Sequence, residues 1–417
     1  MVKCFFLFLA YFFFQGIEIY AIEGFDFSTQ ESTTADFKVV VKNVGQGSCT
    51  ILKNQFNGKN ALIDGGSSAS TPFNLVDDIA KDLGGASINE DLPPIDNDIT
   101  FIVSHTDQDH VDYLHRVFSK NTRLFAQSPQ ILLGDHLANY YKSSDSRTLL
   151  HRIIGNLRNP SSQASSLSHS ISFDSTAITS ETGDIIDTIH SHTYLGYREH
   201  ISINEFLSSD QVASGHSFEI LSVNAGASTK DVRDENTNSA VVRLCIKDKN
   251  ILIMGDATGL TTRRILLTPK NIECLETELL VSSHHGSKVD EANNGLWLGT
   301  IKPKRVAISA GYHGGYKHPH AEFLMDLMII KSLSSSKPHP LALSGPEENL
   351  EFYNLSLAPH ATLKSILEVQ NKEKTKTYRW LNFAVSHSIH STGSSGSLYY
   401  IYNSNGELVH FWSENHL

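Results

Sequence analysis

The chain has 417 residues, of which 40% are apolar and 19% are charged, as in an ordinary globular protein. This length allows one large domain with insertions or two domains. The formal net charge of −11 argues against a broad basic surface for nucleic acid, although it leaves room for a local basic groove.

The N-terminus has the pattern of a targeting segment. A short basic start ending in Lys3 is followed by an apolar run over residues 4–14, and Ala21 is a small residue of the kind found at cleavage sites. This pattern predicts a secretory signal peptide over residues 1–21, with an uncleaved membrane anchor as the alternative. No later stretch is apolar enough to cross a membrane, so we expect a secreted or periplasmic protein without stable membrane insertion.

The first elements after this segment are short strands joined by turns. Apolar patterning predicts strands over residues 37–41 and 49–52, and an Asn-Gly pair at positions 57–58 predicts a hairpin that leads into a strand over residues 60–63. Helical spacing of apolar residues follows over residues 73–83. Strands alternating with a helix favour a layered α/β domain.

A group of histidines and carboxylates follows the next predicted strand. Residues 99–103 are mostly apolar, and His105, Asp107, Asp109 and His110 come directly after them. In a tight loop that opens a helix, these four side chains can converge on one point, and packing like charges together is unfavourable unless a cation neutralises them. The motif therefore predicts a divalent metal site. The alternative is a polar helix start, with the aspartates against the helix dipole and the histidines in solvent.

The second half of the chain repeats the alternation of strands and helices. Strands are predicted over residues 218–223, 240–244, 250–254, 279–281 and 305–309, with a helix over residues 261–267. We expect an α/β domain over residues 35–332, interrupted by a Ser- and His-rich insertion or lid over residues 143–209. Residues 340–417 are expected to form a β-rich C-terminal extension, whose aromatic strands either pack as a capping sheet or bind a substrate or a surface.

Most of the other short motifs stand at predicted strand ends. They are VGQG at 44–47, LIDGG at 62–66, NTNS at 236–239, MGDA at 254–257, HHGS at 284–287 and a His-Pro pair at 318–319. Any one of them is an ordinary turn signal: Asp256 alone would serve as a helix N-cap, and His318 alone as a surface histidine. Their joint order along the chain is the specific signal.

With these motifs in this order, residues 37–330 resemble the metallo-β-lactamase fold superfamily. Within it, they are similar to the extracellular hydrolase domain of bacterial competence (DNA-uptake) channel proteins and their free-standing relatives. The resemblance implies a four-layer αβ/βα sandwich of the α/β class and a hydrolase with two divalent metal ions. Zinc is the expected metal, and manganese and iron are the alternatives.

The resemblance also implies how the central motif divides between the two metals. His105 and Asp107 occupy the first metal position, and Asp109 and His110 occupy the second. Asp256 matches the carboxylate that bridges both metals.

Later motifs supply the remaining residues that the resemblance implies. His285 matches a late histidine ligand, and His284 is either an alternative ligand or a supporting partner. His318 matches a histidine that contacts the substrate or transfers a proton. Asp64 and Asn238 are expected to hold the metal-binding histidines in place.

Two positions depart from the superfamily pattern. Many members have histidine where this chain has Asp107, and a carboxylate there shifts the preference of the first site toward manganese or iron. Asn236 stands where a histidine usually precedes the Gly-Asp motif, and His216 is a nearby substitute. A weakly held first metal, or an enzyme with one metal, is therefore an alternative.

The function expected from this site is hydrolysis by a metal-activated hydroxide, which Asp109 would orient. The first hypothesis is a phosphodiesterase or nuclease that acts on DNA, phosphorylated wall polymers or lipid head groups. The alternatives are an ester or amide hydrolase of the lactamase type and a catalytically silent binding protein on the same fold. Basic residues near the motifs, such as Lys288 and Lys317, offer only a modest track for DNA, and no oligomeric state is predicted.

Overall fold

The structure is a computed structural model, and the residues it describes all lie in one compact unit over Asp36–Leu417. They are residues 36–67, 75–83, 99–114, 117, 130–135, 139, 198–228, 235–268, 271, 275–311, 318–334, 350–356, 380–386 and 389–414. The predicted signal peptide and residues 143–197 of the predicted insertion lie outside them. None of the described helices combines the length and the apolarity needed to span a bilayer.

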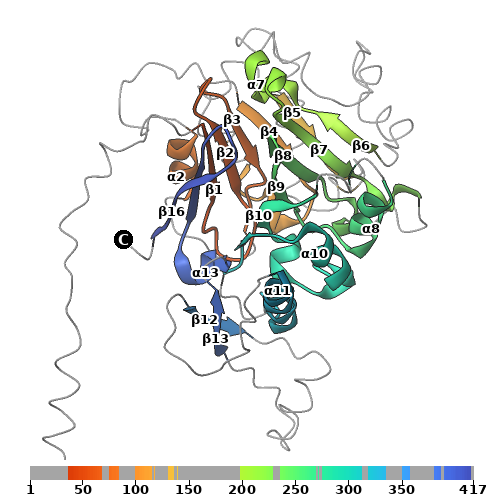
Figure 1. Ribbon diagram of the computed structural model, residues 1–417, viewed down its shortest axis with the longest axis vertical. Helices are drawn as coiled ribbons and strands as arrows, with labels where there is room; N and C mark the ends of the chain where they lie inside the picture. Colours follow the sequence, from red (N-terminus) through yellow and green to blue (C-terminus); the bar gives the residue numbers. More distant parts are fainter. Residues whose placement is uncertain are drawn as a thin grey trace, which may run out of the picture. The chain divides into compact units, whose positions relative to one another are not determined.

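Two seven-stranded mixed sheets form the body of this unit (Figure 1). The first has the order β16 (Leu408–Ser413), β15 (Leu398–Tyr402), β1 (Phe37–Val41), β2 (Thr50–Asn54), β3 (Asn60–Ile63), β4 (Ile99–Val103) and β5 (Gln130–Leu133). The second has the order β14 (Ile389–Ser391), β11 (Arg305–Ile308), β10 (Thr277–Val281), β9 (Lys249–Ile253), β8 (Val241–Ile246), β7 (Ser217–Val223) and β6 (Arg198–Ser202).

The main core lies between the two sheets. Side chains of a strand alternate between its faces, so every second residue points the same way. In β9, Ile251 and Ile253 pack in the cluster that also holds Val39 and Val41 of β1, whereas Leu252 between them joins the second cluster. The two sheets therefore pack face to face.

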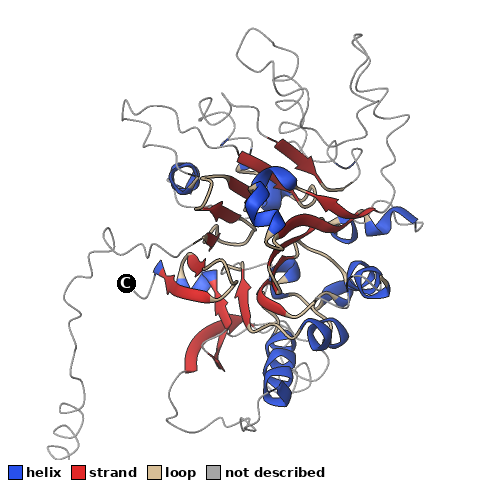
Figure 2. Ribbon diagram, turned by 45° about the horizontal axis from the view of Figure 1, so that its top comes forward, coloured by secondary structure: helices blue, strands red, loops and turns tan. Residues whose placement is uncertain are grey.

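Helices cover the outer faces. Trp297 of α10 (Gly295–Ile301), Phe323 of α11 (Ala321–Ser334) and Ile265 of α8 (Gly259–Leu267) pack against the outer side of the second sheet. On the first sheet, α2 (Leu75–Asp82) buries Val76 and Ile79. Figure 1 shows α2 beside the first sheet and α8 and α10 beside the second, and Figure 2 shows the layers after a 45° turn. This is the αβ/βα sandwich that the resemblance implies.

The last strands of the chain belong to these two sheets. β15 pairs antiparallel with β1, and β14 pairs parallel with β11. Of the region predicted as a C-terminal extension, the described part that forms a sheet of its own is the hairpin of β12 (Leu350–Ser356) and β13 (Trp380–Ser386). Residues 198–202 of the predicted insertion likewise form β6, which pairs with β7.

The parallel part of each sheet positions the site. β3, β4 and β5 run parallel in the first sheet, and β9, β10 and β11 run parallel in the second. Loops at the carboxyl ends of parallel strands form the crevice where α/β proteins hold ligands. The LIDGG, SHTDQDH, MGDA and HHGS motifs all begin at or continue from these ends.

Candidate metal centre

The loop after β4 holds its two histidines through a buried carboxylate. Asp64, at the end of β3, accepts hydrogen bonds from the backbone N–H and the hydroxyl of Ser104, each at 2.7 Å. Its Oδ2 also lies 2.8 Å from Nδ1 of His110. The Ser104 hydroxyl in turn lies 3.0 Å from Nδ1 of His105. Because the Ser104 hydroxyl donates to Asp64, it accepts from His105.

Glycine allows the neighbouring chain to approach this loop closely. A Cβ atom on Gly66 would lie 2.5 Å from the backbone nitrogen of His110 and 2.6 Å from the backbone carbonyl carbon of Asp109. Real Cβ atoms do not come so near to backbone, so a larger residue would push the LIDGG turn away from the loop. The second glycine of this motif is therefore required by packing.

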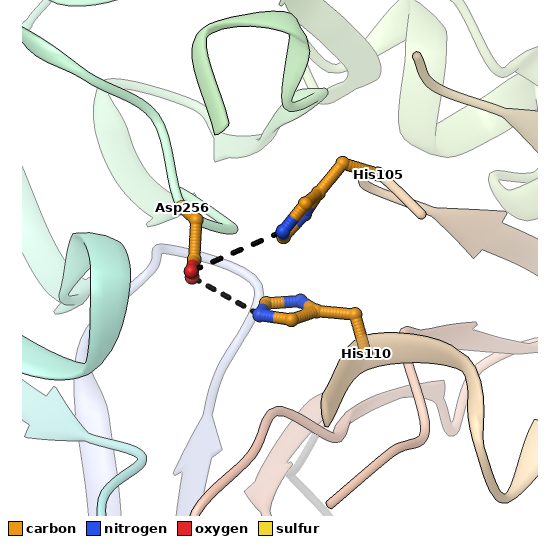
Figure 3. A group of neighbouring side chains, drawn as sticks. All are labelled: His105, His110 and Asp256. Atoms are coloured by element: carbon orange, nitrogen blue, oxygen red, sulfur yellow. Dashed lines mark ion pairs between the residues drawn. The ribbon is translucent and has the colours of Figure 1, made fainter. Parts of the chain in front are cut away.

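The carboxylate of Asp256, after β9, faces the histidines of the central loop (Figure 3). Its Oδ1 lies 3.0 Å from Nε2 of His110, and its Oδ2 lies 3.9 Å from Nε2 of His105. Both rings turn their Nε2 atoms toward Asp256. These three buried residues form a group whose donor atoms all lie within 4.8 Å of one another.

The HHGS turn after β10 brings two more imidazoles to the same carboxylate. Nε2 of His285 lies 3.7 Å from Oδ1 of Asp256 and 3.1 Å from Oδ2 of Asp109. Nε2 of His284 lies 3.7 Å from Oδ2 of Asp256. Asp109, His110 and His285 form a second compact donor group.

Asp256 therefore stands between two sets of donors. Its Oδ1 faces His110 and His285, whereas its Oδ2 faces His105 and His284. Asp107 lies on the Oδ2 side together with His105, since its own Oδ2 lies 3.5 Å from Nε2 of His105.

The hydrogen bonds of three histidines leave their Nε2 atoms available as ligands. Nδ1 of His285 donates to the backbone oxygen of Ser309 at 2.7 Å, Nδ1 of His110 to Asp64, and Nδ1 of His105 to Ser104. A ring whose Nδ1 carries the proton presents a lone pair at Nε2, which is how metal-binding histidines are oriented.

The buried atoms at the centre fit a cation. Among the described residues, Nε2 of His105, Nε2 of His110 and Oδ1 of Asp256 are buried and have no hydrogen-bond partner. Buried polar atoms are normally paired, so these three atoms, which face one another without hydrogen bonds, suit a cation bound between them. Imidazole and carboxylate donors at this spacing suit zinc, and a set with more carboxylates also suits manganese or iron.

The charges of the site depend on one another. Burial opposes the positive charge of His110, but the carboxylates of Asp256 and Asp64 raise the pKa of His110 well above its usual value. Burial likewise opposes the charge of Asp256, yet His110, His284 and His285 hold the pKa of its carboxyl well below the usual range. The raised pKa of His110 and the lowered pKa of Asp256 thus depend on each other's charge.

The remaining predicted residues lie around this centre. The ring of His318 is buried, with its centroid 5.6 Å from that of His284 and 6.0 Å from that of His285. Burial, followed by the neighbouring histidines His285, His284 and His320, lowers the pKa of His318 to about 2, so the ring is neutral.

The two predicted asparagines have different surroundings. Asn236 begins the short helix η6 (Asn236–Asn238), and within the described residues its buried Oδ1 has no hydrogen-bond partner. Asn238 donates to the buried carboxylate of Asp135 at 2.9 Å and accepts from the backbone N–H of Gly226. These two bonds tie Asn238 to the buried carboxylate of Asp135 and to the loop at Gly226.

His216 does not join either donor group. Its ring packs against Phe37, with 5.7 Å between centroids, and its Nδ1 lies 2.9 Å from the backbone oxygen of Gln211. It is a core histidine rather than a substitute for Asn236.

Two residues beside the site were not predicted from the sequence. Ser239, in the NTNS motif, places its hydroxyl 3.2 Å from Nδ1 of His105 and accepts from the backbone N–H of Asp256. The side chain of Glu235 lies close enough to the carboxyl of Asp107 to influence its pKa. Glu235 precedes Asn236 and Ser239 follows Asn238, so their position next to predicted residues is what could have identified them from the sequence.

Comparisons with known proteins give distant structural similarities. No family model and no curated protein matches the chain. The metallo-β-lactamase fold protein YhfI from Bacillus subtilis is 10% identical, with 67% of this chain and 88% of that chain covered and a TM-score of 0.34. A diphosphatase from the PhnP family is 11% identical, with 69% of this chain and 91% of that chain covered and a TM-score of 0.34. A point mutant of the β-hydroxylase CmlA is 14% identical, with 71% of this chain and 49% of that chain covered and a TM-score of 0.31. At these scores the similarity carries no functional argument, which rests instead on the residues of the site.

Proposed function

We propose that the chain is an exported metal-dependent hydrolase of phosphodiesters that works with two divalent metal ions. The observation that supports this most strongly is the position of Asp256, each of whose oxygens faces two imidazole Nε2 atoms. A carboxylate shared between two donor sets suits a pair of adjacent cations, and two-metal sites are common in enzymes that cleave phosphate esters.

The two donor sets divide the ligands between the ions. The first would be held by His105, Asp107, His284 and Oδ2 of Asp256, with His284 in place of the histidine that the chain lacks at Asn236. The second would be held by Asp109, His110, His285 and Oδ1 of Asp256. Zinc is the proposed metal, with manganese or iron as alternatives because Asp107 adds a carboxylate to the first set.

When bound, such ions supply hydroxide at neutral pH and stabilise charge on the attacking and leaving oxygens. The chain's own residues provide orientation. The Asp109 side chain is partly exposed and its Oδ2 lies 3.1 Å from Nε2 of His285, so the carboxylate can accept a hydrogen bond from the attacking water and direct it. His318, beside His284 and His285, is placed to hydrogen-bond to the leaving oxygen.

Export and substrate rest on the sequence. The N-terminal pattern over residues 1–21 supports secretion, and the resemblance to the hydrolase domain of competence proteins supports a phosphodiester. A carboxylic ester or amide is the alternative substrate class, since the same donors polarise a carbonyl oxygen.

The test combines metal analysis with turnover. Purified protein is analysed by mass spectrometry for bound metal and assayed with bis-p-nitrophenyl phosphate in the presence of added zinc or manganese. We expect about two metals per chain and measurable turnover, both reduced in His110→Ala. His216→Ala is the matched control, because His216 is equally a buried histidine but lies outside both donor groups.

The other outcomes separate the alternatives. Bound metal with hydrolysis of nitrophenyl esters or lactams, but not of the phosphodiester, would assign the ester or amide class. Neither metal nor turnover in any assay would leave a binding protein on this fold.

A further inference from the structure

The turn that carries His284 and His285 has an unusual backbone. Three successive residues, His284 (φ 47°), His285 (φ 54°) and Gly286 (φ 80°), are left-handed. Residues with a side chain rarely adopt this conformation, because Cβ lies too close to the following carbonyl oxygen. A sequence with two histidines at these positions therefore needs contacts from outside the turn to hold it.

Gly286 shows how tightly the turn is enclosed. A Cβ atom there would lie 2.7 Å from Cβ of Pro319 and 3.1 Å from the ring of Phe323. The turn is thus pressed against the segment that follows His318, and its shape leaves little room for adjustment.

The side chain of Asn293 is bonded to both ends of this turn. Its Oδ1 accepts from the backbone N–H of Ser283 at 3.2 Å. Its Nδ2 donates to the backbone oxygens of Ser283 at 2.7 Å and of Ser287 at 2.8 Å. The side chain is completely buried, and all three of these bonds end on the two residues that bracket the histidines.

The backbone conformation and the amide group of Asn293 both suit these hydrogen bonds. Its φ of 51° is left-handed, a conformation that asparagine tolerates better than most residues. The amide group is also the only side-chain type of its size that offers one acceptor and two donors in one plane. Aspartate has the same shape but offers no donor when ionised, so it would face the oxygens of Ser283 and Ser287 with a negative charge.

We propose that Asn293 is a positioning residue, which fixes the left-handed turn so that His284 and His285 reach the two sides of Asp256. The inference rests on the proposed function in that it gives both histidines a role in metal binding. Among the hydrogen bonds of the described residues, those of the Asn293 side chain end on the backbone of Ser283 and Ser287, so Asn293 would act on the histidines through the backbone of residues 283–287.

The neighbouring residue offers a matched control. Asn294 accepts a hydrogen bond from the backbone N–H of Trp297 at 2.9 Å and so caps α10, and it makes no hydrogen bond to the turn among those of the described residues. The variants are Asn293→Gly, which keeps the left-handed backbone accessible, Asn293→Asp, which keeps the shape, and Asn294→Ala. Each is compared with the wild type for Co²⁺ binding, followed by absorption spectra, and for thermal unfolding in chelator.

We expect both Asn293 variants to weaken Co²⁺ binding by at least about tenfold and to change the absorption spectrum of the bound ion. Asn294→Ala should lower the unfolding temperature without changing the spectrum, and its Co²⁺ affinity should stay within about twofold of the wild type. Asn293 variants that bind Co²⁺ with wild-type affinity and spectrum would overturn the proposal, whatever their stability.

A second readout does not depend on metal. In metal-free protein labelled with ¹⁵N-histidine, the ring signals of His285 are assigned by their loss in His285→Gln. We expect them to shift in Asn293→Gly and not in Asn294→Ala, because the bond from His285 to Ser309 depends on the turn. If the wild type binds no Co²⁺, the proposed function fails, and unchanged His285 signals in Asn293→Gly would overturn the positioning role separately.

Discussion

Asp64 and His110 are joined by a 2.8 Å contact between Oδ2 and Nδ1, and both side chains are completely buried. The same carboxylate accepts two hydrogen bonds from Ser104, so both oxygens of Asp64 are bonded to the loop that follows β4. The end of β3 in this way sets the orientation of a ring that lies on the short helix α3 (Gln108–Val111).

Replacing Asp64 with asparagine should therefore damage the site more than its modest change in shape suggests. The new amide group turns one donor toward a donor of Ser104 or His110. We expect a loss of about 1–3 kcal/mol in unfolding free energy and about 10–100-fold in metal affinity. Denaturant unfolding and metal titration measure the two. Asp82→Asn, which removes the charge of a carboxylate paired with Lys42 and outside both donor groups, should leave metal affinity unchanged.

Metal content should distinguish the shared carboxylate from the unshared ones. Asp107→Asn removes a donor from one set, so bound metal should fall toward about one ion per chain, whereas Asp256→Asn removes a donor from both sets and should leave less than about one. The measurement is metal analysis after dialysis against trace metal. Asp248→Asn, at an exposed position, is the control. Equal losses in Asp107→Asn and Asp256→Asn would contradict the division of donors.

The pH dependence of stability should reverse when metal binds. In metal-free protein the pKa of His110 is raised above 6.5, so its contribution is fully present below pH 6.5 and is lost as pH rises through the folded-state value. The lowered pKa of Asp256 gives a contribution that is present above pH 3.8 and is lost as pH falls through its folded-state value. The ion pair of His110 with Asp256 thus stabilises metal-free protein most between pH 3.8 and pH 6.5.

Metal must displace the proton on His110, so its binding is favoured as pH rises. Melting curves in chelator and in excess metal, from about pH 5 to about pH 9, check this sign. We expect the gap between the two melting temperatures to widen with pH. A gap that stays constant would mean that His110 binds no metal.

Local sequence pattern was enough to locate many of the strands and to single out the cluster of histidines and carboxylates over residues 105–110. The strands that end before His105 and Asp256 are short apolar runs, and polar residues directly after such runs must gather where parallel strands end. The assignment of residues far apart in the chain, such as Asp109 and His285, to one site came from the resemblance of the ordered motifs to a known superfamily, and the structure places the two side chains 3.1 Å apart.

Two features could not be predicted from local pattern. The pairing of Val39 with Tyr400 joins residues at opposite ends of the sequence, and nothing in either strand specifies its partner. Asn293 is part of an ordinary Asn-Asn turn in the sequence, and its importance comes from three hydrogen bonds to a turn that precedes it. Both depend on tertiary contacts.

The last strands should accordingly contribute to the stability of the whole unit. Leu398 of β15 is completely buried in the core between the sheets, opposite Val41 of β1. Leu398→Ala should cost about 2–5 kcal/mol of unfolding free energy, whereas His410→Ala on the exposed side of β16 should change it by less than about 0.5 kcal/mol. Denaturant unfolding of both variants measures the difference. Equal values would mean that β15 packs only peripherally.

The place of β1 has a consequence for synthesis on the ribosome. Its pairing with β2 needs only neighbouring residues, but its other edge stays open until residues 398–402 have been made. At ordinary elongation rates this interval is on the order of tens of seconds. Until then the open edge of β1 can pair with other chains, so we expect the yield of folded protein to depend on chaperones that keep the chain apart from others until β15 has paired with β1.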